Sequence, residues 1–320
     1  MKVQKNTRGN MIRAEELTKN YGKFRALNKL SFDISPGEII GFLGPNGAGK
    51  STTLRILTGF LSPTSGEAWV SGESVSSTDE SYRSRLGYLP EGAPLYPEMT
   101  VDEFLLFVTR IRKIPQAERA DAIDRAVSAC GLESMRSRLI GQLSKGYRQR
   151  VGIAQAIVHQ PDVLILDEPT SGLDPNQLAE ILDLIRRYGE GRTVLFSSHI
   201  LSEVQAVCTR VLILNQGELI ADDTPENLSN LLSGHRYSLT IQGADSDTVI
   251  GLMNKECGVL RSSIETMGSD SITLSIELDS EARRGEISKR VIESGWTLIE
   301  FKQVEAGLDE VFRELTGDPR

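Results

Sequence analysis

Apolar runs of strand length are separated by glycine-rich loops and helix-like segments through the first two thirds of the chain. The run Val163–Leu166 has no polar position, which is typical of a strand buried inside a parallel sheet. From Thr100 to about Val158 the apolar positions recur at three- and four-residue spacing, which predicts helices. The other expected strands are Ile12–Leu17, Leu30–Ile34, Ile39–Leu43, Glu67–Val70, Leu86–Pro90, Thr193–Ser198 and a hairpin over Val211–Ala221. The pattern predicts an α/β domain that carries a helical insertion.

The last part of the chain shows a different order, strand-helix-strand-strand-helix-strand, which is typical of a ferredoxin-like α+β fold. Its six expected elements are Tyr237–Gln242, Asp247–Cys257, Val259–Thr266, Ser271–Leu278, Glu281–Ser294 and Trp296–Gln303. We therefore expect a first domain over residues 1–228, with its helical insertion at about 92–158, and an accessory domain over 229–320. The amphipathic segment Leu308–Leu315 is expected to form a helix that docks on its own chain.

One glycine-rich stretch lies between an apolar strand and a helix-like segment. Glycines let the backbone bend so that successive N–H groups point at phosphate oxygens, and the helix that follows adds its positive end. Within it, Lys50 can reach the β- and γ-phosphates, and the Ser51 hydroxyl can bind the Mg²⁺ that bridges them. The predicted phosphate-binding residues are Gly44, Pro45, Asn46, Gly47, Ala48, Gly49, Lys50, Ser51 and Thr52.

Paired carboxylates follow the apolar run that ends at Leu166. Strands of parallel sheets carry active-site groups at their carboxyl ends, so Asp167 is placed to hold Mg²⁺ beside Ser51. Glu168 is placed to orient and deprotonate a water aimed at the γ-phosphate. An acidic loop that merely solvates the strand end is the alternative, which the neighbouring phosphate loop disfavours.

Four further residues have both a structural and a functional interpretation. Tyr21, in the loop after the first strand, can stack on adenine or cover the edge of the sheet. Ser144 and Asp174 each stand where a helix begins, and capping alone explains both. His199 follows a strand and is either a satisfied polar residue or a group that touches the γ-phosphate.

Composition narrows the class of protein. The formal net charge is −8 and no long basic run occurs, so nucleic acid is not an expected partner. The three cysteines are far apart in the sequence, which fits a reducing compartment. No apolar run approaches the roughly 18 residues that a membrane-spanning helix needs, and we expect no signal peptide.

Together these segments resemble the ATP-binding subunit of an ABC transporter over residues 12 to about 228. The most specific likeness is the signature, because Walker A and Walker B motifs also occur in many unrelated NTPases. The matching segments are GPNGAGKST (Walker A), LSKGYRQR (signature), VLILDEP (Walker B), SGLD (D-loop) and His199 (switch histidine).

The resemblance implies a head-to-tail dimer that binds and hydrolyses ATP with Mg²⁺. Each ATP would lie between the Walker A loop of one chain and the signature of the other, so that two helix N-termini converge on one polyanion. On this reading Ser144, Gly146 and Asp174 also bind nucleotide, and Lys50, Glu168 and His199 are catalytic. ATP would hold the dimer closed and hydrolysis would loosen it.

The signature has Lys145 and Tyr147 where LSGGQ is commoner, as is usual in the drug-exporter and gliding-motility branch of the family. That branch also carries a C-terminal appendage, and its members pair with separate membrane permeases of the ABC-2 type. The resemblance therefore implies an exporter ATPase held peripherally at the cytoplasmic face of the cell membrane through its permease.

A soluble ABC ATPase that acts on ribosomes or DNA is the alternative function. Translation-type members usually carry two cassettes in one chain and repair-type members carry long coiled coils, whereas this chain has neither and is acidic. The sequence therefore favours transport.

Glu91 departs from the family pattern, because the Q-loop usually has Gln after the corresponding strand. Ionised Glu only accepts hydrogen bonds, and near the triphosphate it is repelled unless it faces Mg²⁺, becomes protonated or points toward the permease. We include Glu91 with Ser51 and Asp167 among the metal candidates, and expect its main role to be coupling to the permease through Glu91–Thr100.

Overall fold

A computed structural model describes residues 9–304 apart from 78–80, 229–234, 254–257, 269 and 281–282. Its contacts divide the chain into two compact units, Met1–Pro225 and Glu226–Arg320. The expected closing helix at 308–315 lies outside the described residues. No helix in the described part of the chain has the length and apolar character needed to cross a membrane.

The first unit is built around a six-stranded sheet in the described residues, in the order β10-β9-β3-β8-β7-β6. Five of its strands are parallel, and β10 is antiparallel at one edge. Its strands are β3 (Ile39–Leu43), β6 (Leu86–Leu89), β7 (Val163–Asp167), β8 (Thr193–Ser198), β9 (Arg210–Asn215) and β10 (Glu218–Asp223). Every residue of β3, β7 and β8 is buried, as their nearly continuous apolar sequences predict.

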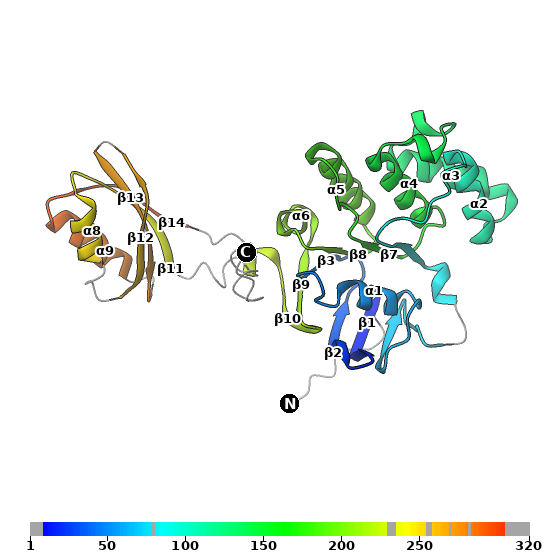
Figure 1. The fold of residues 1–320 in the computed structure, drawn as a ribbon, viewed down its shortest axis with the longest axis horizontal. Helices are drawn as coiled ribbons and strands as arrows, with labels where there is room; N and C mark the ends of the chain where they lie inside the picture. Colours follow the sequence, from blue (N-terminus) through cyan, green and yellow to red (C-terminus); the bar gives the residue numbers. More distant parts are fainter. Residues whose placement is uncertain are drawn as a thin grey trace. The chain divides into compact units, whose positions relative to one another are not determined.

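A second, antiparallel sheet packs with α1 against the first through one shared apolar core (Figure 1). Its order is β2-β1-β4-β5, and the elements are β1 (Ile12–Tyr21), β2 (Phe24–Ile34), β4 (Ser65–Val70), β5 (Glu73–Ser74) and α1 (Lys50–Leu57). Both β1 and β2 are longer than expected and are joined by a two-residue turn. The prediction that Tyr21 lies in a loop is therefore wrong, because Tyr21 pairs with Phe24 as the last residue of β1.

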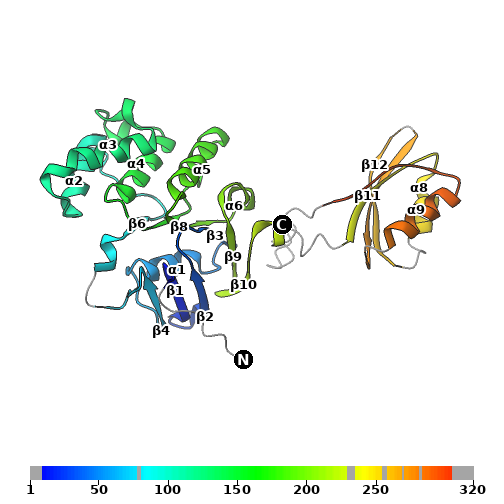
Figure 2. The ribbon, with the colours of Figure 1, turned by 180° about the vertical axis from the view of Figure 1, so that it is seen from behind.

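The expected helical insertion is present and gathers beyond the β6 edge of the sheet (Figures 1 and 2). Its α-helices are α2 (Val101–Ile111), α3 (Arg119–Cys130) and α4 (Lys145–Ile157), and α5 (Pro175–Gly189) and α6 (Leu201–Val207) follow later in the chain. Thr100 and Glu103 form a reciprocal capping box at the start of α2.

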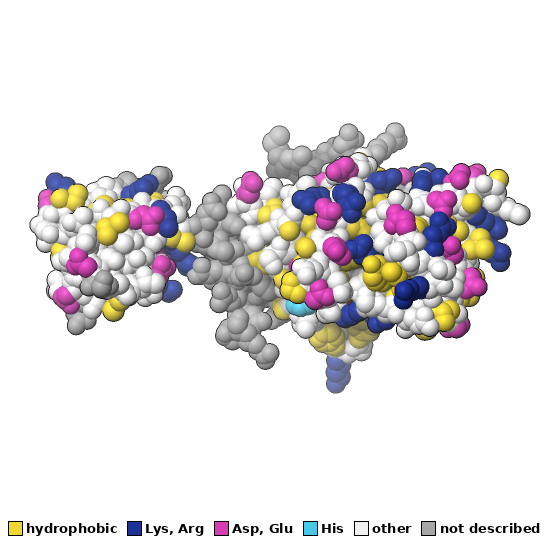
Figure 3. Space-filling view, turned by 90° about the horizontal axis from the view of Figure 1, so that it is seen from above, with side chains coloured by type: hydrophobic (Ala, Val, Ile, Leu, Met, Phe, Trp, Pro, Cys, Tyr) yellow, Lys and Arg dark blue, Asp and Glu magenta, His cyan; other side chains and the backbone are white. Residues whose placement is uncertain are grey.

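Basic and acidic side chains are interspersed over the face of the molecule that Figure 3 shows.

The second unit has the predicted strand-helix order and forms an antiparallel sheet in the order β12-β13-β11-β14. Its elements are β11 (His235–Gln242), α8 (Ser246–Met253), β12 (Val259–Met267), β13 (Ser271–Leu278), α9 (Arg283–Glu293) and β14 (Thr297–Gln303). Alternate residues of β13, from Ile272 to Leu278, are buried in the core that the two helices complete. Figure 2 shows both helices on one face of this sheet. The predicted ferredoxin-like α+β fold is confirmed.

Candidate functional site

Three neighbouring strands bring the candidate residues to one edge of the parallel sheet. β3 runs into the glycine loop after Leu43, β7 ends at Asp167, and β8 ends just before His199. The register pairs Leu43 with Ser198 and Asp167 with Ser197, so the three strand ends are level. Residues that are far apart in the sequence therefore meet in one place.

The glycine loop has a left-handed backbone conformation, which favours glycine, at two of its positions. Gly47 and Gly49 have φ angles of 83° and 106°. A Cβ on Gly49 would lie 2.8 Å from the carbonyl oxygen of Ala26 and 2.7 Å from a methyl carbon of Leu27. Gly49 is also the N-cap of α1, without a side-chain cap, so the first amides of that helix remain available to an anion.

Lys50 is buried at the base of this loop. Its Nζ donates to the carbonyl oxygens of Gly44 at 2.6 Å and Pro45 at 3.3 Å, and lies 3.6 Å from Oε1 of Glu168. Burial lowers the pKa of Lys50, and the carboxylates of Glu168 and Asp167 oppose that effect. The ammonium is therefore held among acceptors that phosphate oxygens can replace.

Asp167 and Ser51 face each other as a divalent cation would require. The Ser51 hydroxyl donates to Oδ1 of Asp167 at 3.2 Å, and the Ser197 hydroxyl donates to the same atom at 2.7 Å. Oδ2 of Asp167 is buried without a hydrogen-bond partner among the described residues. A hard cation that takes oxygen ligands would satisfy it, so the side chains present fit Mg²⁺.

The number of acidic side chains also suits Mg²⁺ bound together with a nucleotide. Within the described ranges, no group of three or more His, Cys, Asp and Glu residues is arranged to hold a metal ion. Mg²⁺ usually takes one or two protein ligands and completes its shell with phosphate oxygens and water. Ser51 and Asp167 would be those ligands, and the ion would neutralise charge on the phosphates.

Glu168 follows Asp167 in the chain and contacts His199. Its Oε2 is 2.9 Å from Nδ1 of His199, and its backbone N–H donates to the Ser197 hydroxyl at 2.9 Å. Glu168 has a φ angle of 50°, a left-handed conformation that non-glycine residues rarely adopt. A carboxylate fixed in this way at the mouth of a phosphate site is suited to act as a general base toward water.

These groups line a cleft of about 530 Å³. Tyr21 and Phe24, which are 46% and 63% exposed, form part of its lining across the turn from β1 to β2. Lys19 lies 5.5 Å from the centroid of the Tyr21 ring, on one of its faces. Two exposed aromatic rings beside a phosphate loop can stack on a planar base.

Glu91, the remaining metal candidate, also lines the cleft. Its charge acts on the Lys50 ammonium and favours the charged form of that group. The Glu91 carboxylate makes no hydrogen bond or ion pair to another described residue. The structure therefore brings Glu91 into the cleft without joining it to Ser51 or Asp167.

Ser144, Gly146 and Asp174 do not line this cleft in the single chain. Ser144 accepts the Tyr147 N–H at 3.3 Å as the N-cap of α4, and Asp174 accepts two N–H groups as the N-cap of α5. Gly146 packs so closely on Gln177 that an added Cβ would lie 2.3 Å from its Oε1. The predicted caps are confirmed, and these two helix starts lie against each other.

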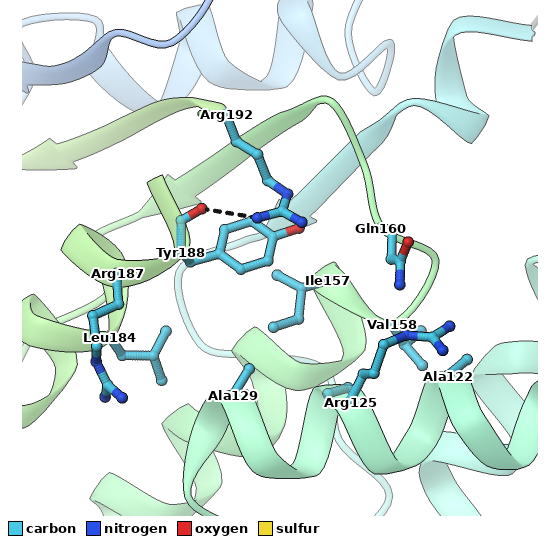
Figure 4. Close-up of a pocket in the computed structure, with 11 residues that line it drawn as sticks. Ala122, Arg125, Ala129, Ile157, Val158, Gln160, Leu184, Arg187, Tyr188 and Arg192 are labelled. Atoms are coloured by element: carbon cyan, nitrogen blue, oxygen red, sulfur yellow. Dashed lines mark hydrogen bonds between the residues drawn. The ribbon is translucent and has the colours of Figure 1, made fainter. Parts of the chain in front are cut away.

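A second cavity, of about 240 Å³, lies among α3, α4 and α5 (Figure 4). Arg192 lies over the Tyr188 ring, 4.6 Å from its centroid, and donates to the Tyr188 carbonyl oxygen at 3.4 Å. Arg187 pairs with Asp183 at 2.9 Å. Arg187 lies in the last turn of α5, and Arg192 follows the helix and donates to one of its last carbonyl groups, so both cations complement the helix dipole. None of the described lining residues is a glycine or an acid, so the cleft at the strand ends is the better nucleotide site.

Three residues that were not predicted from the sequence, and Ser171, which was named only as part of the SGLD segment, belong to the site or support it. The sequence contains a signal for two of them. Phe24 is an aromatic residue three positions after Tyr21, and Ser197 is a polar residue near the end of an apolar strand. Ser171 lines the cleft after Glu168. Glu203 is buried on α6, and its place there is visible only in three dimensions.

Comparisons with known proteins agree with this geometry. Residues 27–171 match the family model described as "ABC transporter". The chain is 33% identical to the bacitracin transport ATP-binding protein BcrA of Bacillus licheniformis, over 96% of this chain and 97% of that protein. It is also 33% identical to the Nod factor export ATP-binding protein I of Rhizobium meliloti, over 96% and 88% of the two chains.

A solved structure is similar to about two thirds of this chain. It is the dimeric, post-hydrolysis state of the ATP-binding cassette MJ0796 bound to ADP and Pi, with 26% identity and a TM-score of 0.61. The match covers 67% of this chain and 98% of that one.

Proposed function

Because this chain belongs to the ABC transporter ATP-binding subunits and is an ATPase of that family, we propose that it powers an export permease of the ABC-2 type by forming a head-to-tail dimer on ATP. The observation that carries the proposal is the convergence of Lys50, Asp167 and Glu168 at one end of the sheet. A phosphate-binding cation, a metal-binding carboxylate and an oriented base are the groups that hydrolysis of a γ-phosphate requires.

The positions of the signature residues support the dimer. Ser144 and Gly146 lie at the start of α4, away from the cleft of their own chain. In a head-to-tail pair this helix start would face the nucleotide held by the other chain, and two helix N-termini would share one triphosphate. The MJ0796 cassette is dimeric in its bound state. ATP would then join the two copies, and hydrolysis would separate them.

A groove beside the cleft supports a separate membrane partner. It has a volume of about 580 Å³ and is rich in aromatic side chains from α2 and the segment after β6. Phe60, Tyr96 and Ile111, which are 77%, 43% and 60% exposed, line it. Exposed apolar side chains gathered in one groove mark an interaction surface. The chain between Glu91 and Tyr96 joins this groove to the nucleotide cleft.

Export is supported by the relatives. BcrA is named for bacitracin transport and the Rhizobium protein for Nod factor export. We place this chain with such exporters, peripheral at the cytoplasmic face of the cell membrane and attached through its permease. The residues that select the transported molecule would belong to the permease.

Co-expression tests this proposal. The chain is produced alone and together with the candidate permease encoded beside it, and cell fractions are probed for the chain. We expect recovery with membranes only when the permease is present, and ATPase activity of the purified chain that depends on Mg²⁺. Firm membrane binding of the chain alone would contradict the proposed attachment, and absence of ATPase activity would contradict the site.

A further inference from the structure

One buried carboxylate near the site has no role in the chemistry described above. Glu203, on α6, is 1% exposed. Its Oε2 accepts hydrogen bonds from the Thr170 hydroxyl at 2.7 Å and the Ser198 hydroxyl at 2.6 Å. Its Oε1 is buried without a hydrogen-bond partner, and no Lys, Arg or His of the described residues forms an ion pair with it.

Such an arrangement is poor for stability. A buried acceptor without a partner retains its desolvation cost, and replacing a polar group and all its partners by apolar ones is often neutral or stabilising. Stability therefore does not explain why a carboxylate is in this position. We explain it instead by the two segments that its hydrogen bonds hold in place.

The two donors belong to the segments that carry Glu168 and His199. Thr170 follows Glu168 by two residues, and Ser198 immediately precedes His199. Because His199 contacts Glu168 at 2.9 Å, the chain and these hydrogen bonds form a closed ring that passes through Glu203. The two hydrogen bonds to Glu203 in this ring are buried, whereas the third contact involves the His199 side chain, which is 46% exposed.

The Ser198 hydroxyl has a second contact that strengthens this ring. It lies 2.9 Å from the backbone nitrogen of Ile200 and accepts that N–H while it donates to Glu203. The backbone on both sides of His199 is therefore tied to the buried carboxylate. The Thr170 carbonyl oxygen, for its part, accepts the N–H of Leu173 at 3.2 Å, which holds the turn toward Asp174.

We propose that Glu203 is a positioning residue that holds Glu168 and His199 face to face at the γ-phosphate and, through Thr170, fixes the residue that precedes the D-loop. This inference rests on the proposed ATPase function of the cleft. Glu203 is buried and does not line the cleft, so it acts through its two hydroxyl partners. Loss of the ring lets His199 and the segment after Glu168 move independently, which lowers the rate of hydrolysis more than the affinity for ATP.

The decisive variant replaces the whole buried group by apolar side chains of similar shape, Glu203→Leu with Thr170→Val and Ser198→Ala. Because the carboxylate and both hydroxyls are removed together, the only group that loses its partner is the Ile200 N–H, at an exposed residue where water can replace the Ser198 hydroxyl, so the full chain is expected to fold with a Tm within a few degrees of the wild type. We expect kcat for ATP to fall about tenfold or more while KM changes by less than about twofold. Glu203→Gln, which keeps one oxygen acceptor, should retain at least about a third of the wild-type kcat.

Gln205→Leu, an exposed position on the same helix, is the matched control and should leave kcat unchanged. A triple variant that keeps kcat within twofold of the wild type would overturn the proposal, as would a rate that falls only together with Tm. Wild-type ATPase activity in the same assay distinguishes failure of the role given to Glu203 from failure of the proposed function. If the wild type hydrolyses ATP and the triple variant does so equally well, only the role of Glu203 is wrong; if the wild type is inactive, the proposed function fails first.

Discussion

Nδ1 of His199 lies 2.9 Å from Oε2 of Glu168, across the ends of two neighbouring parallel strands. The other oxygen of the same carboxylate faces the Lys50 ammonium at 3.6 Å. Glu168 is therefore held between two basic groups, in a left-handed backbone conformation, by contacts within the protein itself. Its orientation is set by the protein, which is how a general base gains most of its advantage.

Glu168→Gln is expected to keep ATP binding and block hydrolysis. The amide has the shape of the carboxylate but cannot take a proton from water, so turnover should fall by at least about a hundredfold. The unhydrolysed ATP should then hold the two copies together. Size-exclusion chromatography with ATP and Mg²⁺ will detect this dimer. A purely monomeric variant under those conditions would contradict either the head-to-tail dimer or the role of Glu168.

Lys50→Ala removes the buried ammonium that faces the phosphates. The loss of a charge-assisted contact corresponds to about tenfold or more in affinity, and turnover should be abolished. Calorimetric titration with ATP and a phosphate-release assay measure the two effects. Lys289→Ala, on an exposed face of α9, is the control and should leave both measurements unchanged. Unchanged ATPase activity in Lys50→Ala would reject the site assignment.

Tyr21 and Phe24 are expected to bind the nucleobase. Replacing both by Ala should weaken ATP binding about 5-fold to 140-fold, because each ring contributes about 0.5–1.5 kcal/mol of stacking. Tyr21→Phe keeps the ring and should bind ATP as the wild type does. The comparison is made by titration with ATP and with inorganic triphosphate, which has no base. Equal weakening for both ligands would show that the two rings serve the fold and not the base.

Glu91→Gln tests the departure from the usual Q-loop residue. Because Glu91 is exposed and makes no bond to Ser51 or Asp167, ATP affinity and basal hydrolysis should stay within a few-fold of the wild type. Activity stimulated by the permease should change, because the following segment leads to the apolar groove. Basal turnover as low as in Glu168→Gln would place Glu91 among the catalytic residues instead.

The stability of the first unit should fall in mild acid because of His159. Burial lowers the pKa of His159 from 6.5 to about 4, and the Arg112 guanidinium acts in the same direction. Between these two values the unfolded chain holds a proton that the folded chain does not, so stability rises with pH across this window and is lost as pH falls. The full effect is about 3 kcal/mol.

Urea unfolding at pH 7 and pH 4.5 measures this dependence, and His159→Gln removes the titrating group. The variant should lose part of the pH dependence seen in the wild type. If the two proteins respond to acid equally, His159 is not the group that titrates.

Much of the fold could be predicted because several local signals agreed with one another. The apolar run before Asp167 could only be a buried strand, and Thr100 with Glu103 marked the start of α2 at the correct residue. The alternation along β13 marked which face of the last sheet is buried. Tyr21 was misplaced because turn length between β1 and β2 depends on pairing across the sheet, which no single strand reveals.

The site was predictable as far as it depends on motifs at strand ends. Lys50, Asp167 and Glu168 meet as expected because parallel strands deliver their ends to one edge. Glu203 could not be found in this way, because an acid in a short helix is ordinarily a solvated residue. The carboxylate of Glu203 reaches the hydroxyls of Thr170 and Ser198 only because α6 packs against β8 in the folded chain.

The bare glycine cap of α1 has a consequence for measuring occupancy. The first amides of this helix have no side chain to accept their hydrogens, so in the absence of nucleotide they should exchange rapidly with deuterated solvent. Phosphate oxygens would accept those same hydrogens and slow the exchange. The amides of Lys50, Ser51 and Thr52 therefore form a built-in reporter of nucleotide binding, which can be followed in variants that no longer turn over.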